Sequence, residues 1–417
     1  MARDVTKERE WALARARRGN DVRLLRRPAT ATSPEFDIGY VRTGPRGDTP
    51  VLVLPGGPGL ASITLYGRFR KAAAARGLDV LMADHRGVAF SRRDIHGRDL
   101  PPEAMSLDQA ADDLAALLDA EEIAQVIVSG TSYGTTLAQA FGARHPQRVA
   151  GMVLDSTVLS AQDHHEARRV SRERLWEGGD PQLADLAAKI RILVQRDGFD
   201  PLPLGDAARL MYEFGGRELL SRYLEQLVRG QADATEAAVR KLMEQEANVG
   251  APGVMEFDLV GRIAFHELHY YPEPDGLIFD QSPGLAQSAA GHPPFAGEPY
   301  DLPAELPRFD WLTAVISGDR DLRCPQTVAE RTVSLLPDGV LVPIAQMGHA
   351  ALDTHYEVLL EVLRAVRDND RGRLAALART RGAGLARRGV SGLLGPLLRT
   401  LLIVEKPVAP LVRALLR

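Results

Sequence analysis

A serine lies between two glycines in the string GTSYG, residues 130–134, where an apolar run gives way to a helical pattern. Two interpretations fit this string. In the first, Gly130 and Gly134 make a tight turn and Ser132 caps the helix that follows. In the second, the small residues tolerate a strained strand-to-helix turn that presents the Ser132 hydroxyl as a nucleophile. The second interpretation requires a base, an acid and oxyanion donors elsewhere in the chain.

An acid and a histidine follow Ser132 along the chain, each on a stretch directly after a strand-like run. Asp321 follows TAVIS in the string ISGDRDLRCP, and His349 follows GVLVPIA in the string QMGHAALD. His349 is the one histidine of ten that stands directly after a late strand. We therefore predict a catalytic triad of Ser132, His349 and Asp321, with Asp319 as the competing acid.

The oxyanion donors are predicted from a glycine-rich turn. The string PGGPG, residues 55–59, follows the strand-like run VLVL, and its glycines let backbone N–H groups approach a ligand closely. The backbone N–H groups of Gly57 and Tyr133 would then form the oxyanion hole. A simple turn is the alternative explanation of PGGPG.

These candidates need a scaffold that brings strand ends together. Apolar strand-like runs alternate with helical patterns, which indicates a mostly parallel sheet with helices on both faces. The predicted strands are FDIGYVR (36–42), PVLVLP (50–55), LDVLMAD (78–84), AQVIVSG (124–130), RVAGMVLD (148–155), WLTAVISGD (311–319) and GVLVPIA (339–345). Helices are predicted over 106–120, with a serine cap, and over 135–145, 326–336 and 350–366.

The alternation stops for a long stretch in the middle of the chain. Residues 161–303 carry charged helical segments and a loop rich in Pro and Gly, which predicts a helical cap inserted into one α/β domain. The core would then comprise residues 28–160 and 304–366. A basic amphipathic extension, residues 367–417, would follow and pack on the body, on another subunit or on an anionic membrane surface.

Composition limits the classes of function. Hydrophobic residues make up 45% and charged residues 25% of the 417, as in a globular enzyme. The single cysteine, Cys324, excludes an internal disulfide and agrees with a cytoplasmic location, as does the lack of a secretory signal pattern. The ends are basic and residues 28–360 have a net charge of −17, without the basic, aromatic face that nucleic-acid binding needs. An acidic body suits a cationic substrate or is simply a solvated surface.

Together these motifs resemble those of the proline iminopeptidase (prolyl aminopeptidase) family of α/β-hydrolases. PGGPG stands where the family has HGGPG, ADHRGVAFS (83–91) where it has a DQRGxGxS-like string, and GTSYG where it has GxSxG with an aromatic fourth residue. The likeness covers residues 36–160 and 305–365. It implies an α/β-hydrolase fold and a serine aminopeptidase that acts on short peptides or aminoacyl substrates without a metal or other cofactor. In ADHRGVAFS, we expect Asp84 and Arg86 to form an ion pair that braces the loop.

Two cap residues are assigned by the same resemblance. RIAFHELHYY (262–271) resembles the family's cap helix whose acidic residue binds the substrate's free α-amine, which places Glu267 in that role. Glu177, in RLWEGG, would be a second amine ligand by analogy with a WE string in family caps. The alternatives are an esterase or thioesterase with the same triad and uncharged acyl substrates, and a non-catalytic protein that binds a small ligand. Pro55, His85 and Tyr133 depart from the family's usual residues, so the resemblance leaves the preferred N-terminal residue open.

Overall fold

The computed structural model describes residues 5–47, 49–196, 200–230, 235–240 and 252–415. An eight-stranded sheet forms the base of the molecule, in the order β1-β2-β4-β3-β5-β6-β7-β8. Strand β2 is antiparallel to β1 and β4, and the remaining neighbours are parallel. The strands are β1 (Arg23–Arg27), β2 (Phe36–Thr43), β3 (Val51–Leu54), β4 (Val80–Ala83), β5 (Val126–Thr131), β6 (Val149–Asp155), β7 (Thr313–Gly318) and β8 (Gly339–Ile344).

The seven strands predicted from the sequence correspond to β2–β8, and the prediction missed β1. This strand reads RLLRR and pairs with β2 at the sheet edge, after helix α1 (Val5–Gly19). The predicted start of the core at residue 28 is therefore too late. An edge strand with only partly buried side chains carries no apolar alternation by which it could be recognised.

Apolar side chains alternate between the two faces of the sheet. On β3, Leu52 and Leu54 contribute to one apolar cluster, whereas Val51 and Val53 contribute to the other. Helices α4 (Leu107–Ala120), α5 (Tyr133–Arg144) and α13 (Gln326–Leu335) cover the first face. Helices α2 (Ser62–Leu65), α3 (Gly67–Ala74) and α15 (Tyr356–Arg367) cover the second. This is the layered arrangement that the sequence predicts.

Local signals fix several helix ends. The Ser106 hydroxyl accepts a hydrogen bond from the Gln109 N–H at 3.2 Å, which confirms the predicted cap of α4. The helix predicted over 350–366 is divided at His355 into α14 (Ala351–Thr354) and α15. Short helical turns complete the core, namely η1 (Ala89–Ser91), η2 (Pro102–Ala104), η3 (Pro146–Arg148) and η6 (Leu306–Arg308).

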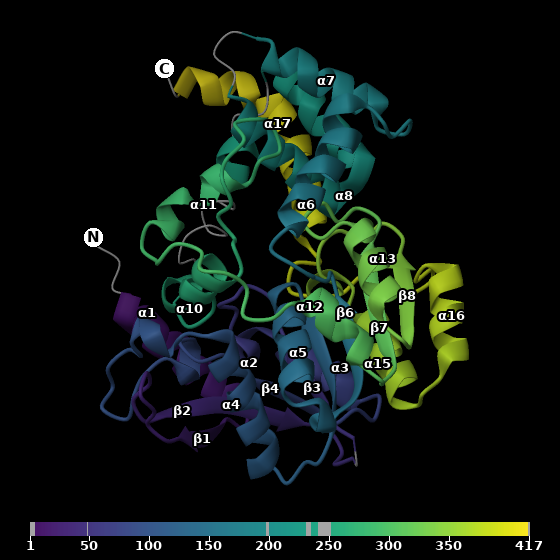
Figure 1. Cartoon of the computed structure of the whole chain (residues 1–417). Coiled ribbons are helices and arrows are strands. Elements are labelled where there is room, and N and C mark those ends of the chain that lie inside the picture. Colours follow the sequence, from purple (N-terminus) through teal and green to yellow (C-terminus); the bar gives the residue numbers. More distant parts are fainter. Residues whose placement is uncertain (1–4, 48, 197–199, 231–234, 241–251, 416–417) are drawn as a thin grey trace.

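The described part of the segment that connects β6 to β7 is helical, and most of it forms a second layer above the sheet (Figure 1). Its helices are α6 (Asp163–Arg172), η4 (Glu173–Glu177), α7 (Ala184–Val194), α8 (Pro201–Val228), α10 (Phe257–Arg262), η5 (Ile263–Glu267), α11 (Ser282–Ala289) and α12 (Leu302–Glu305). Helices α6–α8 share an apolar cluster that is separate from those of the sheet and that includes Leu322 from the core. Residues 241–251 of the predicted cap lie outside the described residues.

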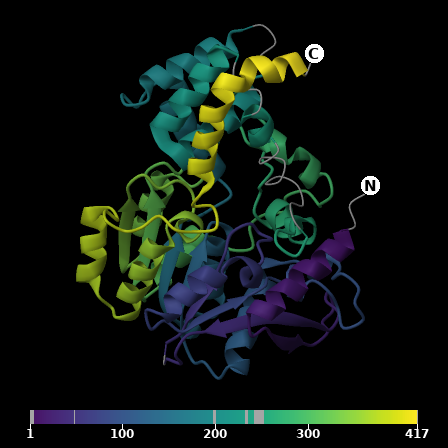
Figure 2. The ribbon, with the colours of Figure 1, turned by 180° about the vertical axis from the view of Figure 1, so that it is seen from behind.

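The C-terminal extension connects the two layers. Helix α16 (Arg371–Thr380) packs beside β8, and α17 (Leu394–Leu415) runs up to the cap and packs along α8 (Figures 1 and 2). Leu398 and Leu402 of α17 are buried in the cap cluster. In the described part of the chain, no helix is both long and apolar enough to cross a membrane.

Candidate active site

Ser132 occupies a strained turn between β5 and α5. Its φ of 54° and ψ of −123° lie outside the regions that L residues ordinarily adopt. A Cβ atom at Gly130 would lie 2.1 Å from the Gly134 carbonyl oxygen, and one at Gly134 would lie 2.1 Å from that of Leu54, so both positions require glycine. The Ser132 side chain makes no capping hydrogen bond. The helix-cap interpretation of GTSYG is therefore wrong.

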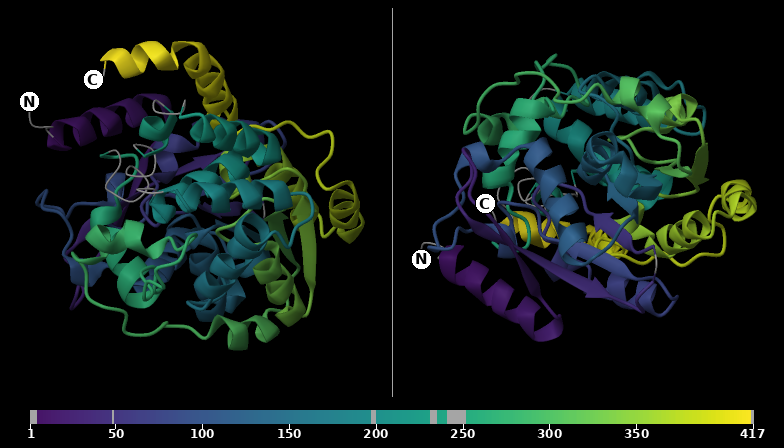
Figure 3. Two further views of the ribbon diagram at one scale, coloured as in Figure 1. Left: turned by 90° about the horizontal axis from the view of Figure 1, so that it is seen from above. Right: turned by 60° about the horizontal axis from the view of Figure 1, so that its bottom comes forward.

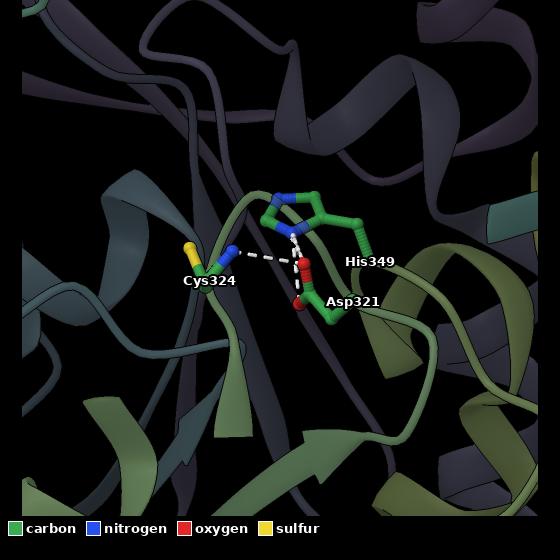
Figure 4. Close-up of side chains that lie close together, drawn as sticks. All are labelled: Asp321, Cys324 and His349. Atoms are coloured by element: carbon green, nitrogen blue, oxygen red, sulfur yellow. Dashed lines mark hydrogen bonds and ion pairs between the residues drawn. The ribbon is translucent and has the colours of Figure 1, made fainter. Parts of the chain in front are cut away.

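His349 and Asp321 lie together on the loops after β8 and β7 (Figure 4). The Nδ1 atom of His349 is 3.1 Å from Oδ2 and 3.2 Å from Oδ1 of Asp321. Oδ1 also accepts hydrogen bonds from the backbone N–H groups of Arg323 at 3.0 Å and Cys324 at 2.9 Å, which orient the buried carboxylate. By contrast, the side chain of Asp319 contacts Arg381, at 3.4 Å. Asp321 is thus the carboxylate that contacts the imidazole.

Burial and neighbouring charges shift the pKa values of both His349 and Asp321. Burial disfavours the imidazolium, but the Asp321 carboxylate outweighs that effect and raises the pKa of His349. Burial likewise opposes ionisation of Asp321, but His349 and the hydrogen bonds keep the pKa of Asp321 below its ordinary value. Burial and the nearby Asp321 charge raise the pKa of the Cys324 thiol well above its usual range. The thiol therefore remains protonated. In the His349–Asp321 pair, a charged carboxylate lies beside a basic imidazole.

A cavity of about 1040 Å³ lies between the sheet and the cap. Ser132, His349 and Gly57 line it, so the structure brings the predicted nucleophile, base and one oxyanion donor to one space. Tyr133 is the first residue of α5, and the leading N–H groups of a helix have no partner within it. Its backbone N–H is therefore placed beside Ser132, while its hydroxyl contacts His85 Nε2 at 2.9 Å.

The structure does not bring the two predicted amine ligands into this space. Glu267 is absent from the residues that line the cavity, and its Oε2 accepts a hydrogen bond from the Leu107 N–H at 2.9 Å, at the start of α4. Glu177 ends η4 with an exposed side chain and does not line the cavity either. A carboxylate at a motif-like position can therefore serve a helix N-terminus instead of a ligand.

The expected ion pair between Asp84 and Arg86 is also wrong. Arg86 makes a bidentate pair with Asp113, with both N to O distances at 2.7 Å. Asp84 instead accepts backbone hydrogen bonds from Ile63 at 3.1 Å and Phe90 at 3.3 Å, and burial raises the pKa of Asp84 to about 7. Each side chain still braces a loop beside the site, through a partner distant in the sequence.

The residues at the end of β6 support the active site, a role that was not predicted from the sequence. Asp155 accepts hydrogen bonds from the backbone N–H groups of Ala351 at 2.8 Å and Leu352 at 3.0 Å, and the Ser156 hydroxyl accepts one from Ala350 at 2.9 Å. These contacts hold the loop directly after His349. Burial raises the pKa of Asp155 to about 6. The signal was present, since VLDS places two polar residues at the carboxyl end of a buried strand.

A cap residue, Glu213, reaches the acid loop. Its side chain is 1% exposed, and its Oε1 accepts a hydrogen bond from the Leu322 N–H at 3.3 Å. Its Oε2 contacts Arg323 at 3.3 Å and Arg209 at 3.4 Å. The backbone of Glu213 also packs on the His349 loop, because a Cβ atom at Gly348 would lie 2.6 Å from the Glu213 carbonyl oxygen. Nothing in the sequence around Glu213 indicates these contacts.

Comparison with known proteins agrees with this geometry. Residues 49–188 match the family model described as alpha/beta hydrolase fold. The strand order, the strained serine and the sequence match together show that the chain has the α/β-hydrolase fold.

Within that class the chain is similar to proline iminopeptidases. It is 34% identical over 115 residues to the proline iminopeptidase of Heyndrickxia coagulans. The aligned region covers 28% of this chain and 37% of that relative. It is 23% identical over 324 residues to a probable proline iminopeptidase of Leptolyngbya boryana. This aligned region covers 76% of this chain and 86% of the relative.

Two solved structures are similar to the chain over most of its length. A proline iminopeptidase of Mycobacterium smegmatis superposes with a TM-score of 0.49 at 17% identity, covering 85% of this chain and 99% of that one. A thermophilic esterase of Thermogutta terrifontis gives a TM-score of 0.47 at 20% identity, covering 84% and 99%.

Proposed function

We propose that this α/β-hydrolase is a serine aminopeptidase that releases the N-terminal residue of short peptides. The observation that carries the serine mechanism is the contact of His349 Nδ1 with the buried Asp321, at 3.1 Å, beside a cavity that the strained Ser132 also lines. The similarity to proline iminopeptidases supports the substrate class.

The proposed reaction proceeds through an acyl-enzyme. His349 takes the proton from the Ser132 hydroxyl, whose oxygen attacks the scissile carbonyl carbon. The backbone N–H groups of Gly57 and Tyr133 stabilise the resulting oxyanion. His349 then donates the proton to the leaving amine, and a water molecule hydrolyses the ester by the same steps. Asp321 holds the imidazole in the required tautomer throughout.

An aminopeptidase must recognise the substrate's ammonium group, and among the five acidic residues that line the cavity we assign Asp163 to this role. Asp163 lines the cavity, and its charge raises the pKa of Cys324, which lies beside the triad. Its Oδ2 accepts hydrogen bonds from the N–H groups of Leu159 at 2.6 Å and Ser160 at 3.0 Å. Among the described residues, the Oδ1 atom has only a 3.5 Å contact with the Ser160 hydroxyl. Oδ1 is thus able to accept a charge-assisted hydrogen bond from an ammonium group.

A substrate panel tests this assignment. Aminoacyl-naphthylamides with a free amine should be hydrolysed about ten- to a hundredfold faster, in kcat/KM, than the same compounds acetylated, because a charge-assisted contact contributes roughly 1.5–3 kcal/mol. Asp163→Asn should remove this preference and spare p-nitrophenyl esters. Glu267→Gln is the matched comparison, and a larger loss there would return the amine site to the residue assigned by resemblance.

An esterase or thioesterase is the second candidate, favoured by apolar cavity residues such as Leu204, Phe279 and Leu285. Equal hydrolysis of free and acetylated amides by the wild-type enzyme, with faster turnover of esters, would establish this candidate and reject the aminopeptidase. No turnover of either class would instead point to a non-catalytic, ligand-binding protein.

Glu213 should affect the pH dependence of catalysis. Burial and Asp321 have the larger effects on the pKa of His349, and the Glu213 carboxylate adds a smaller increase. Glu213→Gln should therefore lower that pKa slightly and move the acid limb of the kcat/KM profile to lower pH. The weaker hold on the acid loop should also lower kcat on the order of tenfold. Glu218→Gln, an exposed change on the same helix, is the control. A Glu213→Gln profile that coincides with the wild-type profile would contradict the predicted coupling.

A further inference from the structure

Over residues 394–404, whose side chains the structure describes, helix α17 is apolar on two sides, and one of these sides is covered. Leu398 and Leu402 are buried against the cap cluster at 5% and 0% exposure. On the opposite side, positions 393, 397, 400 and 404 recur at helical spacing and face solvent. Four exposed residues of this segment are large and aliphatic, and we call them the α17 stripe: Leu393 (71%), which directly precedes the helix, Leu397 (63%), Ile403 (53%) and Val404 (55%). An exposed row of this kind marks an interaction site.

The segment that carries the α17 stripe is strongly basic. Residues 371–404 contain seven arginines and no acidic residue or lysine, within a chain whose residues 28–360 have a net charge of −17. Four of these arginines contact acids of the body and still expose 45–63% of their side chains: Arg371, Arg381, Arg388 and Arg399. Exposed ion pairs of this type are weak and leave the guanidinium groups able to exchange partners.

Helix α1 presents a second surface of the same character. Trp11 is 61% exposed, with the Arg15 guanidinium 5.5 Å from its ring centroid, and Arg17 and Arg18 are exposed as well. Figure 2 shows α1 and α17 on the same side of the molecule, and the left panel of Figure 3 shows them along the same edge. Tryptophan and arginine side chains are favoured where an apolar region meets phosphate head groups.

We propose that α17 and α1 bind the surface of an anionic lipid bilayer, with the α17 stripe entering the boundary between head groups and acyl chains. Charge complementarity selects this partner: the exposed Arg399 lies on α17 within an aliphatic row that itself bears no charge, and α1 adds further exposed arginines. A second copy of the chain fits less well. A stable dimer buries roughly 800 Å² per partner, whereas the stripe is one helix face wide. A two-fold contact across it would also bring like-charged arginines together.

Co-sedimentation of the full chain with vesicles tests the proposal. The protein should sediment with vesicles of phosphatidylcholine and 30 mol % phosphatidylglycerol, and should remain in solution with phosphatidylcholine alone. Raising the salt concentration should weaken the binding, because charge attraction contributes to it. Trp11 emission should shift to shorter wavelength on binding, and the shift should disappear in Trp11→Phe.

The double variant Leu393→Ser/Leu397→Ser should bind the anionic vesicles about tenfold more weakly, since two leucines lose their apolar contact with lipid. Leu277→Ser, a matched change at a residue that is 57% exposed outside both helices, should bind like the wild type. Hydrolytic activity without vesicles serves as the folding control for each variant. Equal binding by the double variant, or no sedimentation of the wild type, would overturn the proposal. So would a dimer in light scattering that the double variant abolishes, which would make the α17 stripe a subunit contact.

Discussion

Replacing Ser132 with alanine should lower kcat by on the order of 10⁴-fold or more, because the proposed reaction then has no nucleophile. The fold should persist. The Ser132 hydroxyl makes no capping hydrogen bond, and the contact that holds the turn is made by the backbone N–H, at 2.9 Å from the Asp155 carbonyl oxygen. Turnover of the preferred substrate is the measurement, with circular dichroism to confirm that the variant folds.

A labelling experiment distinguishes loss of the nucleophile from loss of the fold. A fluorophosphonate probe should modify the wild-type enzyme and leave Ser132→Ala unlabelled. Ser129→Ala, on the strand β5 that precedes Ser132, is the matched control, since the Ser129 hydroxyl is buried without a hydrogen-bond partner among the described residues. It should retain labelling and activity. A folded Ser132→Ala protein that keeps most of its activity would exclude the serine mechanism altogether.

Asp321→Asn should lower kcat by roughly 10³- to 10⁴-fold, the second-largest effect that we expect. The amide keeps the shape of the side chain, but it cannot stabilise the imidazolium that forms when His349 takes the proton. Asp319→Asn is the matched control, two residues away on the same loop, and should cost little because its side chain contacts Arg381 rather than His349. The reverse ranking of the two variants would transfer the role of acid to Asp319.

The pH dependence of the residual activity gives an independent check. The Asp321 charge raises the pKa of His349, so in the wild-type enzyme the neutral imidazole is lost at a higher pH than for an ordinary histidine. The acid limb of kcat/KM should therefore move to lower pH in Asp321→Asn. A shift toward higher pH would show that another group controls the limb.

Short-range patterns in the sequence were sufficient to predict the strands β2–β8, the glycine-flanked turn at Ser132 and the order of Ser132, Asp321 and His349. The physical reason is that each of these features is local. A short apolar run between turn residues is typical of a buried central strand, and Gly130 and Gly134 are required by contacts of under 3 Å with neighbouring backbone. The carboxyl ends of parallel strands meet at one edge, so residues after β5, β7 and β8 converge without further information.

Tertiary structure alone decided how the cap, the edge strand and the C-terminal extension meet the core. Glu267 occupies a motif-like position, yet it contacts the start of α4, more than 150 residues away. Glu213 gives no local signal, and its burial against Leu322 and Arg323 depends on how α8 rests on the acid loop. One apolar side of α17 packs on α8, and this packing leaves the other apolar side exposed. Such contacts join segments whose separation along the chain is large, and they are set by packing that no short window of sequence contains.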